Sequence, residues 1–491
     1  MKQLVITSTA AALCILTTAC TVGPKYSQPP VTTPASYKEI ADLRTREGWK
    51  EAQPNEGAIR GDWWQIFGDA ELNNLEEQLN KNNQTIAQSF QNYMAARALV
   101  RYAHANLFPS LTVGASVSHY ATGPVSTARS SNSISQNSYE LPLDVSWQPD
   151  LFGRIRNTIR EYSNAAQVSA ANLANERLSE QASLAQYLFQ LRGEDALEQL
   201  YQQTVKSYQQ SLELTQTLVQ TGINSPQDVA QAETNLRTAQ ANATSIGIAR
   251  AQYEHAIALL VGQPASTFSI PVKPLDSKPP VIPIGLPSQL LERRPDVAAA
   301  ERTMAEANAL IGVGKAAYYP TVSLSASGGT QTSAIANLLT WPARFWSLGG
   351  SVSETLLDFG ARRATVQQYQ AQYEADVAAY RQTVLTAFRE VEDYVAAVRI
   401  LATQAEEQAE AVASSKQYLD IANARYQTGV DTYLNVLTAQ NAFLTSQLSQ
   451  INLRTNQMTS SVQLIAALGG GWNAAQLPSE KDVQKRPAAT P

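Results

Sequence analysis

Two stretches of the chain alternate between apolar and polar residues with a period of two. The first covers about 110–148 and the second about 321–358. The apolar positions that open the first stretch are Leu111, Val113, Ala115 and Val117. This alternation predicts β-strands with one apolar and one polar face, two strands in each stretch. A packed β-sandwich would show the same alternation, so the pattern alone does not distinguish strands in a protein core from strands in a bilayer.

The length of these strands and the placement of their aromatic residues favour strands that cross a bilayer. Such strands need ~9–11 residues, and aromatic side chains gather near their ends. The aromatic residues near the strand ends are Tyr139, Trp147, Trp341, Phe345 and Trp346. An open sheet edge leaves backbone groups unpaired in lipid. Four strands of this kind are therefore expected to close into a barrel together with strands from other copies of the chain.

The other segments have the pattern of long helices. Residues 361–428 contain neither proline nor glycine. Their apolar positions recur at every seventh residue, beginning with Ala364, Ala371, Ala378 and Leu385. This spacing predicts a coiled-coil helix that could reach ~100 Å. Residues 155–221 have the same character, with an interruption expected at Gly193. Shorter helices are expected near 71–106, 226–261, 287–316 and 432–468, and an ordinary helical bundle is the alternative interpretation.

The chain repeats itself. The motif D-L-F-G around Phe152 returns as L-D-F-G around Phe359, 207 residues later. Pro109 and Pro320, which precede the strands, are 211 residues apart, so one inter-strand loop is four residues shorter in the second copy. A period of this length indicates a duplicated domain rather than a solenoid built from units of ~20–50 residues. We expect repeats at 61–270 and 287–471, a proline-rich linker at 271–286 and a disordered tail at 472–491.

Composition narrows the classes of function. The net charge is −5 and only 16% of residues are charged, which excludes a basic face for nucleic acid. The three histidines, His104, His119 and His255, have no partner at metal-ligand spacing. The sequence also lacks the phosphate-loop, nucleophile-elbow and H-E-x-x-H motifs. We therefore expect no catalytic site, no cofactor and no metal site.

The N-terminus has the pattern of an export signal. Lys2 precedes an apolar stretch that ends at Leu16, and small residues lead to Cys20. L-T-T-A-C resembles a bacterial lipoprotein cleavage site, so we expect a signal peptide at 1–19 and lipidation of Cys20. The mature chain would then hold a single cysteine, which excludes an internal disulfide. Residues 20–60 are expected to form an extended tether, and ordinary signal-peptidase cleavage is the alternative.

Several motifs together resemble one family. They are W-W-Q-I-F-G-D at Trp63, L-E-R-R-P-D at Leu291, L-D-F-G at Leu357 and R-Y-Q-T-G-V-D-T-Y-L-N-V-L at Arg425. These resemble the TolC-type outer-membrane efflux channels, in particular the lipoprotein branch that serves RND drug exporters of Gram-negative bacteria. The resemblance extends over roughly 61–471.

This resemblance implies a homotrimer in the outer membrane, with a twelve-stranded barrel and an α-helical periplasmic tunnel. It further implies a periplasmic adaptor protein, an inner-membrane RND transporter and a passive exit duct for drugs and other small toxic compounds. Ducts for secreted polypeptides or metal ions on the same fold remain alternatives. So does a structural lipoprotein without a pore.

The family likeness places the functional region at two helix hairpins. Gly222 and Ser225 belong to the first turn, and Gly429 and Thr432 to the second; all four are expected to contact the adaptor. The residues expected to close the channel are Asp228, Asp431, Asn435 and Thr438. Asp228 and Asp431 could instead be helix-capping residues. In the R-R-P-D motif, Pro295 and Asp296 suit the first turn of a helix better than a ligand site.

Overall fold

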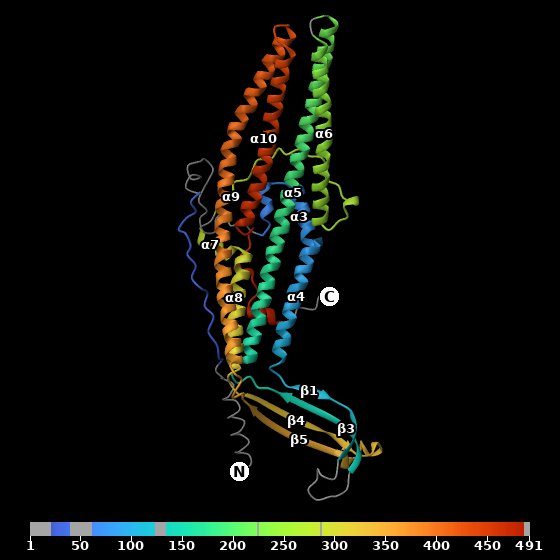
Figure 1. Ribbon diagram of the computed structural model, residues 1–491, viewed down its shortest axis with the longest axis vertical. Coiled ribbons are helices and arrows are strands. Elements are labelled where there is room, and N and C mark those ends of the chain that lie inside the picture. The colour runs from blue at the N-terminus through green and yellow to red at the C-terminus, as the bar shows by residue number, and fades with distance from the viewer. Residues whose placement is uncertain (1–20, 40–60, 123–133, 223–224, 285–286, 486–491) are drawn as a thin grey trace.

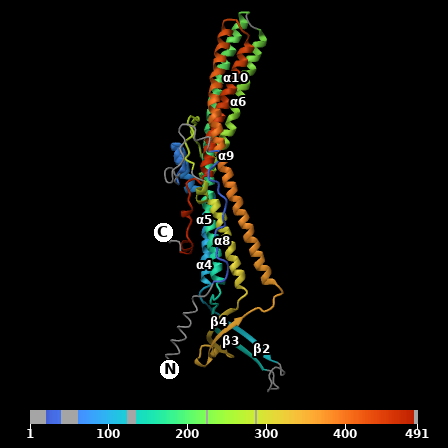
Figure 2. The ribbon, with the colours of Figure 1, turned by 90° about the vertical axis from the view of Figure 1, so that its left-hand side faces the viewer.

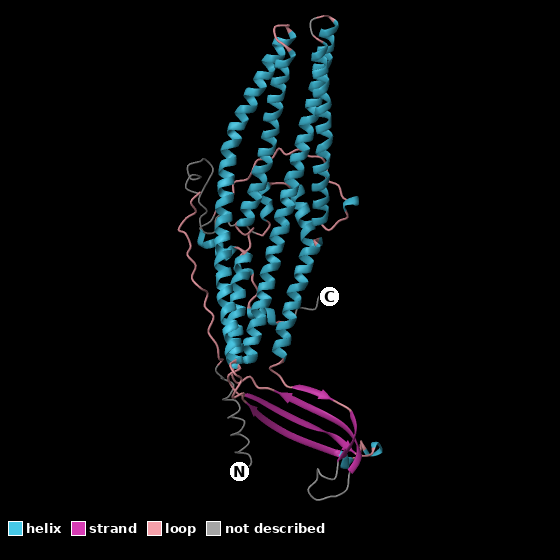
Figure 3. Cartoon of the chain, in the orientation of Figure 1, coloured by secondary structure: helices cyan, strands magenta, loops and turns pink. Residues whose placement is uncertain are grey.

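The protein is an elongated body with strands at one end and helix hairpins at the other (Figures 1 and 3). The computed structural model describes residues 21–39, 61–122, 134–222, 225–284 and 287–485. Cys20, the expected lipidation site, lies outside these residues. In Figure 2 the helices again form one long body, with the strands beyond its lower end. No helix among the described residues is both long and apolar enough to cross a bilayer.

The predicted duplication appears in the bounds of the helices. In the first repeat they are α3 (Ala70–Asn82), α4 (Gln84–Ala105), α5 (Arg154–Gln220) and α6 (Pro226–Leu260). The second repeat has α7 (Pro287–Arg293), α8 (Pro295–Ala316), α9 (Ala361–Gln427) and α10 (Tyr433–Ala467). Both ends of α5 and α6 lie 207 residues before the ends of α9 and α10. Both ends of α4 lie 211 residues before those of α8. The same backbone unit is therefore built twice.

The two long helices, α5 and α9, each have 67 residues, which corresponds to ~100 Å. The interruption expected at Gly193 is wrong, because α5 continues through it. A Cβ atom at Gly193 would lie 2.5 Å from Oγ1 of Thr455 on α10. The glycine thus allows two helices to approach closely without ending either of them.

The strands form one antiparallel sheet. They are β1 (Ser110–Val113), β2 (Ser116–Thr122), β3 (Ile134–Trp147), β4 (Thr321–Thr332) and β5 (Arg344–Ser353). β1 and β2 both pair with β3 in the same register, so together they form one strand that is interrupted between Val113 and Ser116. Gly114 in the gap donates to the carbonyl of Pro142 (3.0 Å), but proline has no N–H to return the bond. If β1 and β2 are taken as one interrupted strand, the four expected strands are present, in the order β1/β2, β3, β4, β5.

The shorter helices of each repeat meet end to end beside the long helix. Asn83, between α3 and α4, donates to the Leu260 carbonyl at the end of α6 (3.0 Å). Arg294, between α7 and α8, donates in the same way to Ala467 at the end of α10 (3.2 Å). In the R-R-P-D motif, Pro295 occupies the first helical turn together with Asp296, as the structural interpretation predicted. The main hydrophobic core surrounds these joints and includes Trp63, Leu188, Phe189, Ile257 and Ile465.

The N-terminal segment 21–39 packs along the outside of the helices. Val22 and Pro24 accept hydrogen bonds from Asn157 on α5 (2.8 Å) and Asn308 on α8 (3.2 Å). Further along, Arg399 on α9 pairs with Glu39 (2.6 Å). These contacts hold the segment against α5, α8 and α9, from the end near the sheet to about the middle of α9.

The tail expected to be disordered is ordered over 472–485. α11 (Glu480–Gln484) begins with a capping box between Ser479 and Asp482. Val483 is fully buried against Val100 and Ala166. Arg97 on α4 donates to the carbonyl of Lys485 (2.7 Å). One buried apolar side chain and a bridging arginine therefore dock a segment whose composition suggested disorder.

Candidate functional site

Both hairpin turns end their long helix with a left-handed glycine. Gly222 has φ +79° and Gly429 has φ +73°. In the second turn, the N–H of Val430 donates to the carbonyl of Arg425 and that of Gly429 to Tyr426, both at 3.0 Å. This is the pattern of a Schellman cap, which needs a residue at positive φ. A Cβ atom on either glycine would meet nothing within 4 Å. Glycine is thus required by the backbone angle and not by crowding inside the chain.

Asp431 lies at the centre of a polar network in the second turn. Its carboxylate pairs with Nε of Arg425 (3.2 Å) and accepts from the N–H of Thr432 (2.9 Å). It also accepts from the amide of Asn435, one turn into α10. The bonds from Asn435, Thr432 and Arg425 lower the pKa of Asp431. Thr438 lies a further turn along the same exposed face of α10, so three of the four expected gate residues share one face.

Asp228 lies on the other hairpin, in the first turn of α6. Its carboxylate accepts from the backbone N–H of Ser225 (3.2 Å), as in a capping box. The helix-capping interpretation of Asp228 therefore has direct support. A capping carboxylate keeps its negative charge, so a cap and a channel-lining charge are compatible.

A small cluster below the tips holds the two hairpins together. Tyr426 and Tyr433 pack with ring centroids 5.7 Å apart, in a cluster with Ala232, Val436 and Ala439. The hydroxyl of Tyr426 bonds to Oγ1 of Thr215 on α5 (3.1 Å). Burial raises the pKa of Tyr433 to about 12, so this ring stays neutral at physiological pH. The contacts within this cluster are therefore neutral and partly polar, in contrast to a purely apolar core.

One feature of the tips escaped the sequence interpretation, although it has a local signal. Arg425, the ion-pair partner of Asp431, lies in the quoted R-Y-Q-T-G-V-D motif six residues before it.

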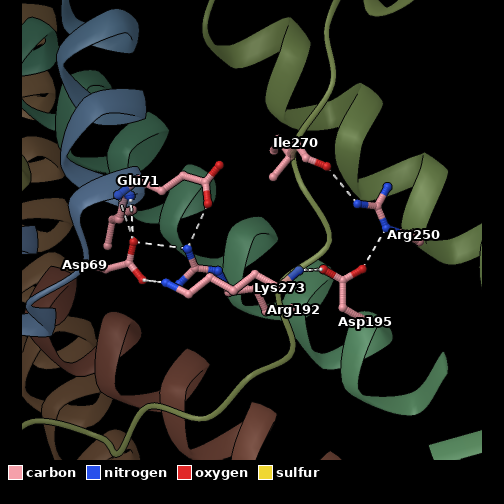
Figure 4. A network of polar contacts seen from close by, with 8 residues as sticks. Asp69, Glu71, Arg192, Asp195, Arg250, Ile270 and Lys273 are labelled. Carbon is pink, nitrogen blue, oxygen red and sulfur yellow. Dashed lines mark hydrogen bonds and ion pairs between the residues drawn. The ribbon is translucent and has the colours of Figure 1, made fainter. Parts of the chain in front are cut away.

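A second polar network lies at mid-length, far from the tips (Figure 4). Nη2 of Arg192 on α5 bonds to Asp69 and Glu71 at the start of α3, both at 3.1 Å. Asp195 pairs with Arg250 (2.7 Å) and accepts from the N–H of Lys273 (2.8 Å). These bonds fix α3 and the segment after α6 to the middle of α5. No cluster of His, Cys, Asp or Glu suited to a metal occurs among the described residues.

Comparison with known proteins decides the family. The sequence model described as "Outer membrane efflux protein" matches residues 75–263 and 286–470. The chain belongs to this family. It is 33% identical over 413 residues to the solvent efflux pump outer membrane protein SrpC of Pseudomonas putida, covering 84% of this chain and 88% of that protein. It is 31% identical over 464 residues to OprJ of Pseudomonas aeruginosa, covering 93% and 94%.

Solved structures agree with this assignment. The outer-membrane channel OprN superposes with a TM-score of 0.85 at 30% identity, covering 92% of this chain and all of that one. The open state of the MtrE outer membrane channel of Neisseria gonorrhoeae gives 0.79 at 25% identity, covering 93% and 99%. The predicted fold class of long helices with transmembrane strands is thus confirmed. This outer membrane efflux protein is the outer-membrane channel component of an efflux pump, in a family of transport proteins.

Proposed function

We propose that three copies of this chain form a passive exit duct, with a twelve-stranded barrel in the outer membrane and a helical tunnel below it. The observation that carries the proposal is the sheet of the single chain, whose outer strands β1/β2 and β5 have no further strand partner among the described residues. Large apolar side chains on both outer strands are exposed, including Leu111, Val113, Leu348 and Val352. Open edges are not stable in lipid, and joining edges between copies would pair them.

We propose small toxic organic compounds as the exported class. Relatives are named for solvent, toluene and antibiotic efflux. A duct of this kind does no chemistry of its own, so the driving force comes from an inner-membrane RND transporter joined through a periplasmic adaptor. Polypeptide or metal-ion export on the same fold is the alternative. Resistance tests with solvents, antibiotics and copper or silver salts in a deletion strain separate these classes.

We propose that Cys20 is acylated. Thr21, the first described residue, lies against Gly153 at the junction between the sheet and α5. A lipid on Cys20 would therefore sit beside the strands, where the bilayer begins. Labelled palmitate should enter the wild type, and Cys20→Ser should abolish this incorporation.

The hairpin tips are the proposed docking surface for the adaptor. Val430 is 65% exposed at the second tip, and the space around Gly429 is open. We expect Gly429→Trp to lower drug resistance by blocking close approach of a partner, while the trimer and its level in the membrane are unchanged. Gly429→Ala is the matched control, because alanine meets the same strain at positive φ as tryptophan but adds little bulk. Full resistance in the tryptophan variant, measured as minimal inhibitory concentrations, would place the docking surface elsewhere.

Carboxylates at the tips should make the channel cation-selective. Three copies bring up to six carboxylates, from Asp228 and Asp431, around one opening, and such rings favour cations. We expect Asp431→Ala to lower cation preference and the double variant with Asp228→Ala to lower it further. Arg425→Gln should act in the opposite direction, because it leaves Asp431 without its ion-pair partner.

The cation preference of the wild type and of the three variants is measured as the reversal potential in planar bilayers under a salt gradient. The same recordings test the duct itself, because a structural lipoprotein without a pore would give no conductance steps. If the double variant keeps the wild-type reversal potential, Asp228 and Asp431 act only as helix caps.

A further inference from the structure

A cavity of about 530 Å³ lies between the N-terminal segment and the helices beside the sheet. From α5 it is lined by Asn157, Arg160 and Asn164, and residues 21–26 form another wall. The N-terminal segment begins at the end of the body that carries the sheet (Figure 1). A cavity of this size can hold a small ligand or part of a larger one.

The wall formed by the N-terminal segment is held in place by close packing. Gly23 has φ +135°, and a Cβ atom on it would lie 2.7 Å from Cα of Gly312 on α8. A Cβ atom on Gly312 would in turn lie 2.5 Å from Nδ2 of Asn157. The same amide donates to the carbonyl of Val22 (2.8 Å). Two glycines and a buried amide thus fix the segment across the two helices, so the cavity is a built feature of the fold.

The charges that line the cavity favour an anion. The lining includes three basic residues, Lys25, Arg160 and Arg302, and one carboxylate, that of Glu480. Arg302 is already compensated, because it pairs with Glu301. Lys25 and Arg160 are exposed and form no ion pair with another described residue. Two uncompensated cations therefore face a single carboxylate.

Asn164 adds an unused hydrogen-bonding group to the same space. It is only 5% exposed, and its side chain has no hydrogen-bond partner in the part of the chain that the structure describes. Burial of an amide without a partner is unfavourable, which indicates a ligand. Arg160 and Asn164 are four residues apart and thus share one face of α5. At the offset of 207 residues, α9 has Gln367 and Ala371, so the duplicated unit can be built without these two side chains.

The cavity lies close to the level at which the lipid core ends. Tyr319, two residues before β4, stacks on Phe152 with ring centroids 4.8 Å apart, and Trp147 ends β3. Aromatic residues at strand ends mark the boundary of the lipid core. Arg160 lies seven residues, or ~10 Å, beyond Gly153 at this junction. A headgroup layer is ~5–8 Å thick, and a long arginine side chain can span the difference.

We propose that this cavity binds the phosphate of an anionic phospholipid in the periplasmic leaflet of the outer membrane. Arg160 and Asn164 donate to the phosphate oxygens, and Lys25 adds a second positive charge. Guanidinium groups suit phosphate because their N–H groups match its oxygens in pairs. The acyl chains then extend into the bilayer around the sheet. All of these residues belong to one chain, so the site does not depend on the proposed homotrimer.

Native mass spectrometry of the delipidated full chain in a mild detergent tests the site. In the presence of dioleoylphosphatidylglycerol, the wild type should retain one lipid per chain. Arg160→Gln and Asn164→Leu should each weaken the apparent affinity about tenfold or more, because each removes a donor to a charged group. Arg363→Gln is the matched control, since Arg363 is exposed near the start of α9 and does not line the cavity. Circular dichroism of the lipid-free variants should match that of the wild type.

Two further probes identify the part of the lipid that is bound. Dioleoylglycerol, which lacks the phosphate, should not be retained. Inorganic phosphate at the same concentration as the lipid should not displace it. The same spectra give the mass of the assembly, so a failure of the homotrimer is seen separately from a failure of the lipid site.

A wild type that retains no lipid overturns the proposal, and so does equal retention by the wild type, Arg160→Gln and Asn164→Leu. Equal retention of dioleoylglycerol would show contact with acyl chains only, and displacement by inorganic phosphate would show a site for free phosphate. Retention only in Cys20→Ser would mean that an acyl group on the chain itself fills the cavity. Each of these three results also contradicts a phospholipid headgroup site.

Discussion

Replacing Arg192 with alanine is expected to destabilise the protein by about 3–5 kcal/mol, the cost of leaving a buried charge without its partner. The side chain of Arg192 is 3% exposed and that of Asp69 is 8% exposed. Asp69 also caps α3 by accepting from the N–H groups of Glu71 and Leu72, both at 3.0 Å. Removal of the guanidinium therefore leaves the buried carboxylate with the more distant and half-exposed Lys273 (Nζ at 3.7 Å), and it weakens the attachment of α3 to α5. Thermal unfolding followed by circular dichroism measures the loss.

The matched control is Arg237→Ala. Arg237 pairs with Glu233 on the exposed surface of α6 at 3.5 Å, with side chains 68% and 55% exposed. Exposed pairs of this kind contribute about 0–1 kcal/mol, so this variant should unfold almost like the wild type. Asp69→Asn combined with Arg192→Leu should recover part of the loss, because asparagine still caps the helix without a buried charge. Equal unfolding temperatures for Arg192→Ala and Arg237→Ala would show that the buried network is not stabilising.

The effect of Arg192→Ala should depend on pH. Burial alone would raise the pKa of Asp69, but the bonds from Arg192 and the N–H of Leu72 outweigh burial and lower it to about 2, from the usual 3.8. A lowered carboxyl pKa contributes stability above the unfolded pKa, and this contribution is lost as the pH falls through the folded pKa. Without Arg192 the pKa of Asp69 rises, so the variant has its greatest deficit above about pH 4. We expect the difference between variant and wild type to shrink between about pH 4 and pH 2.

Most of the fold could be predicted from the sequence because its elements are long and periodic. A heptad pattern with two phase shifts, in a stretch without proline or glycine at 361–428, predicts α9, which ends at Gln427. The left-handed glycines, Gly222 and Gly429, mark the two turns within a residue or two. The repeat supports the helices beside them, since α4 and α6 have counterparts in α8 and α10 at offsets of 211 and 207 residues.

The errors occurred where long-range contacts outweigh local preference. Gly193 suggested an interruption, but the helix continues because close packing against Thr455 uses the absent side chain. The tail was expected to be disordered, and burial of Val483 together with bonds from Arg97 orders it. Neither contact can be derived from sequence spacing, since the partners lie hundreds of residues apart.

The positions of the two hairpin turns could be predicted from the sequence, whereas the polar contacts within them could not. Asn435 and Thr438 lie on one exposed face of α10, and Asp431 lies in the turn just before that helix, as their spacing indicates. The ion pair with Arg425 depends on how the chain reverses direction within the turn, which periodicity does not describe. It changes the expected charge of the gate, because a compensated carboxylate attracts cations less strongly than a free one.

Glu76 presents the opposite case to Arg192, because its carboxyl group is buried without a partner in the described part of the chain. It lies on α3 among Leu72, Leu75 and Leu79, is completely buried, and neither of its side-chain oxygens has a hydrogen-bond partner among the described residues. Burial raises the pKa of Glu76 well above its usual value. An unpaired buried polar group costs about 1–3 kcal/mol even when neutral.

We therefore expect Glu76→Leu to stabilise the protein by about 1–3 kcal/mol, the cost of the unpaired group that it removes. A raised carboxyl pKa means that the folded state binds more protons than the unfolded state above the unfolded pKa, so wild-type stability falls as the pH rises through the folded pKa. The advantage of the leucine variant should thus grow with pH.

Glu77→Leu is the control, because Glu77 is 68% exposed on the next position of the same helix. Glu77→Leu makes the same replacement of a carboxyl group by leucine, but at an exposed position. Its effect on the free energy of unfolding should therefore stay within about 0.5 kcal/mol. Thermal unfolding at pH 5 and pH 8 distinguishes the two variants. An unchanged or lower unfolding temperature for Glu76→Leu at both pH values would mean that the carboxyl group finds a partner in the assembled protein.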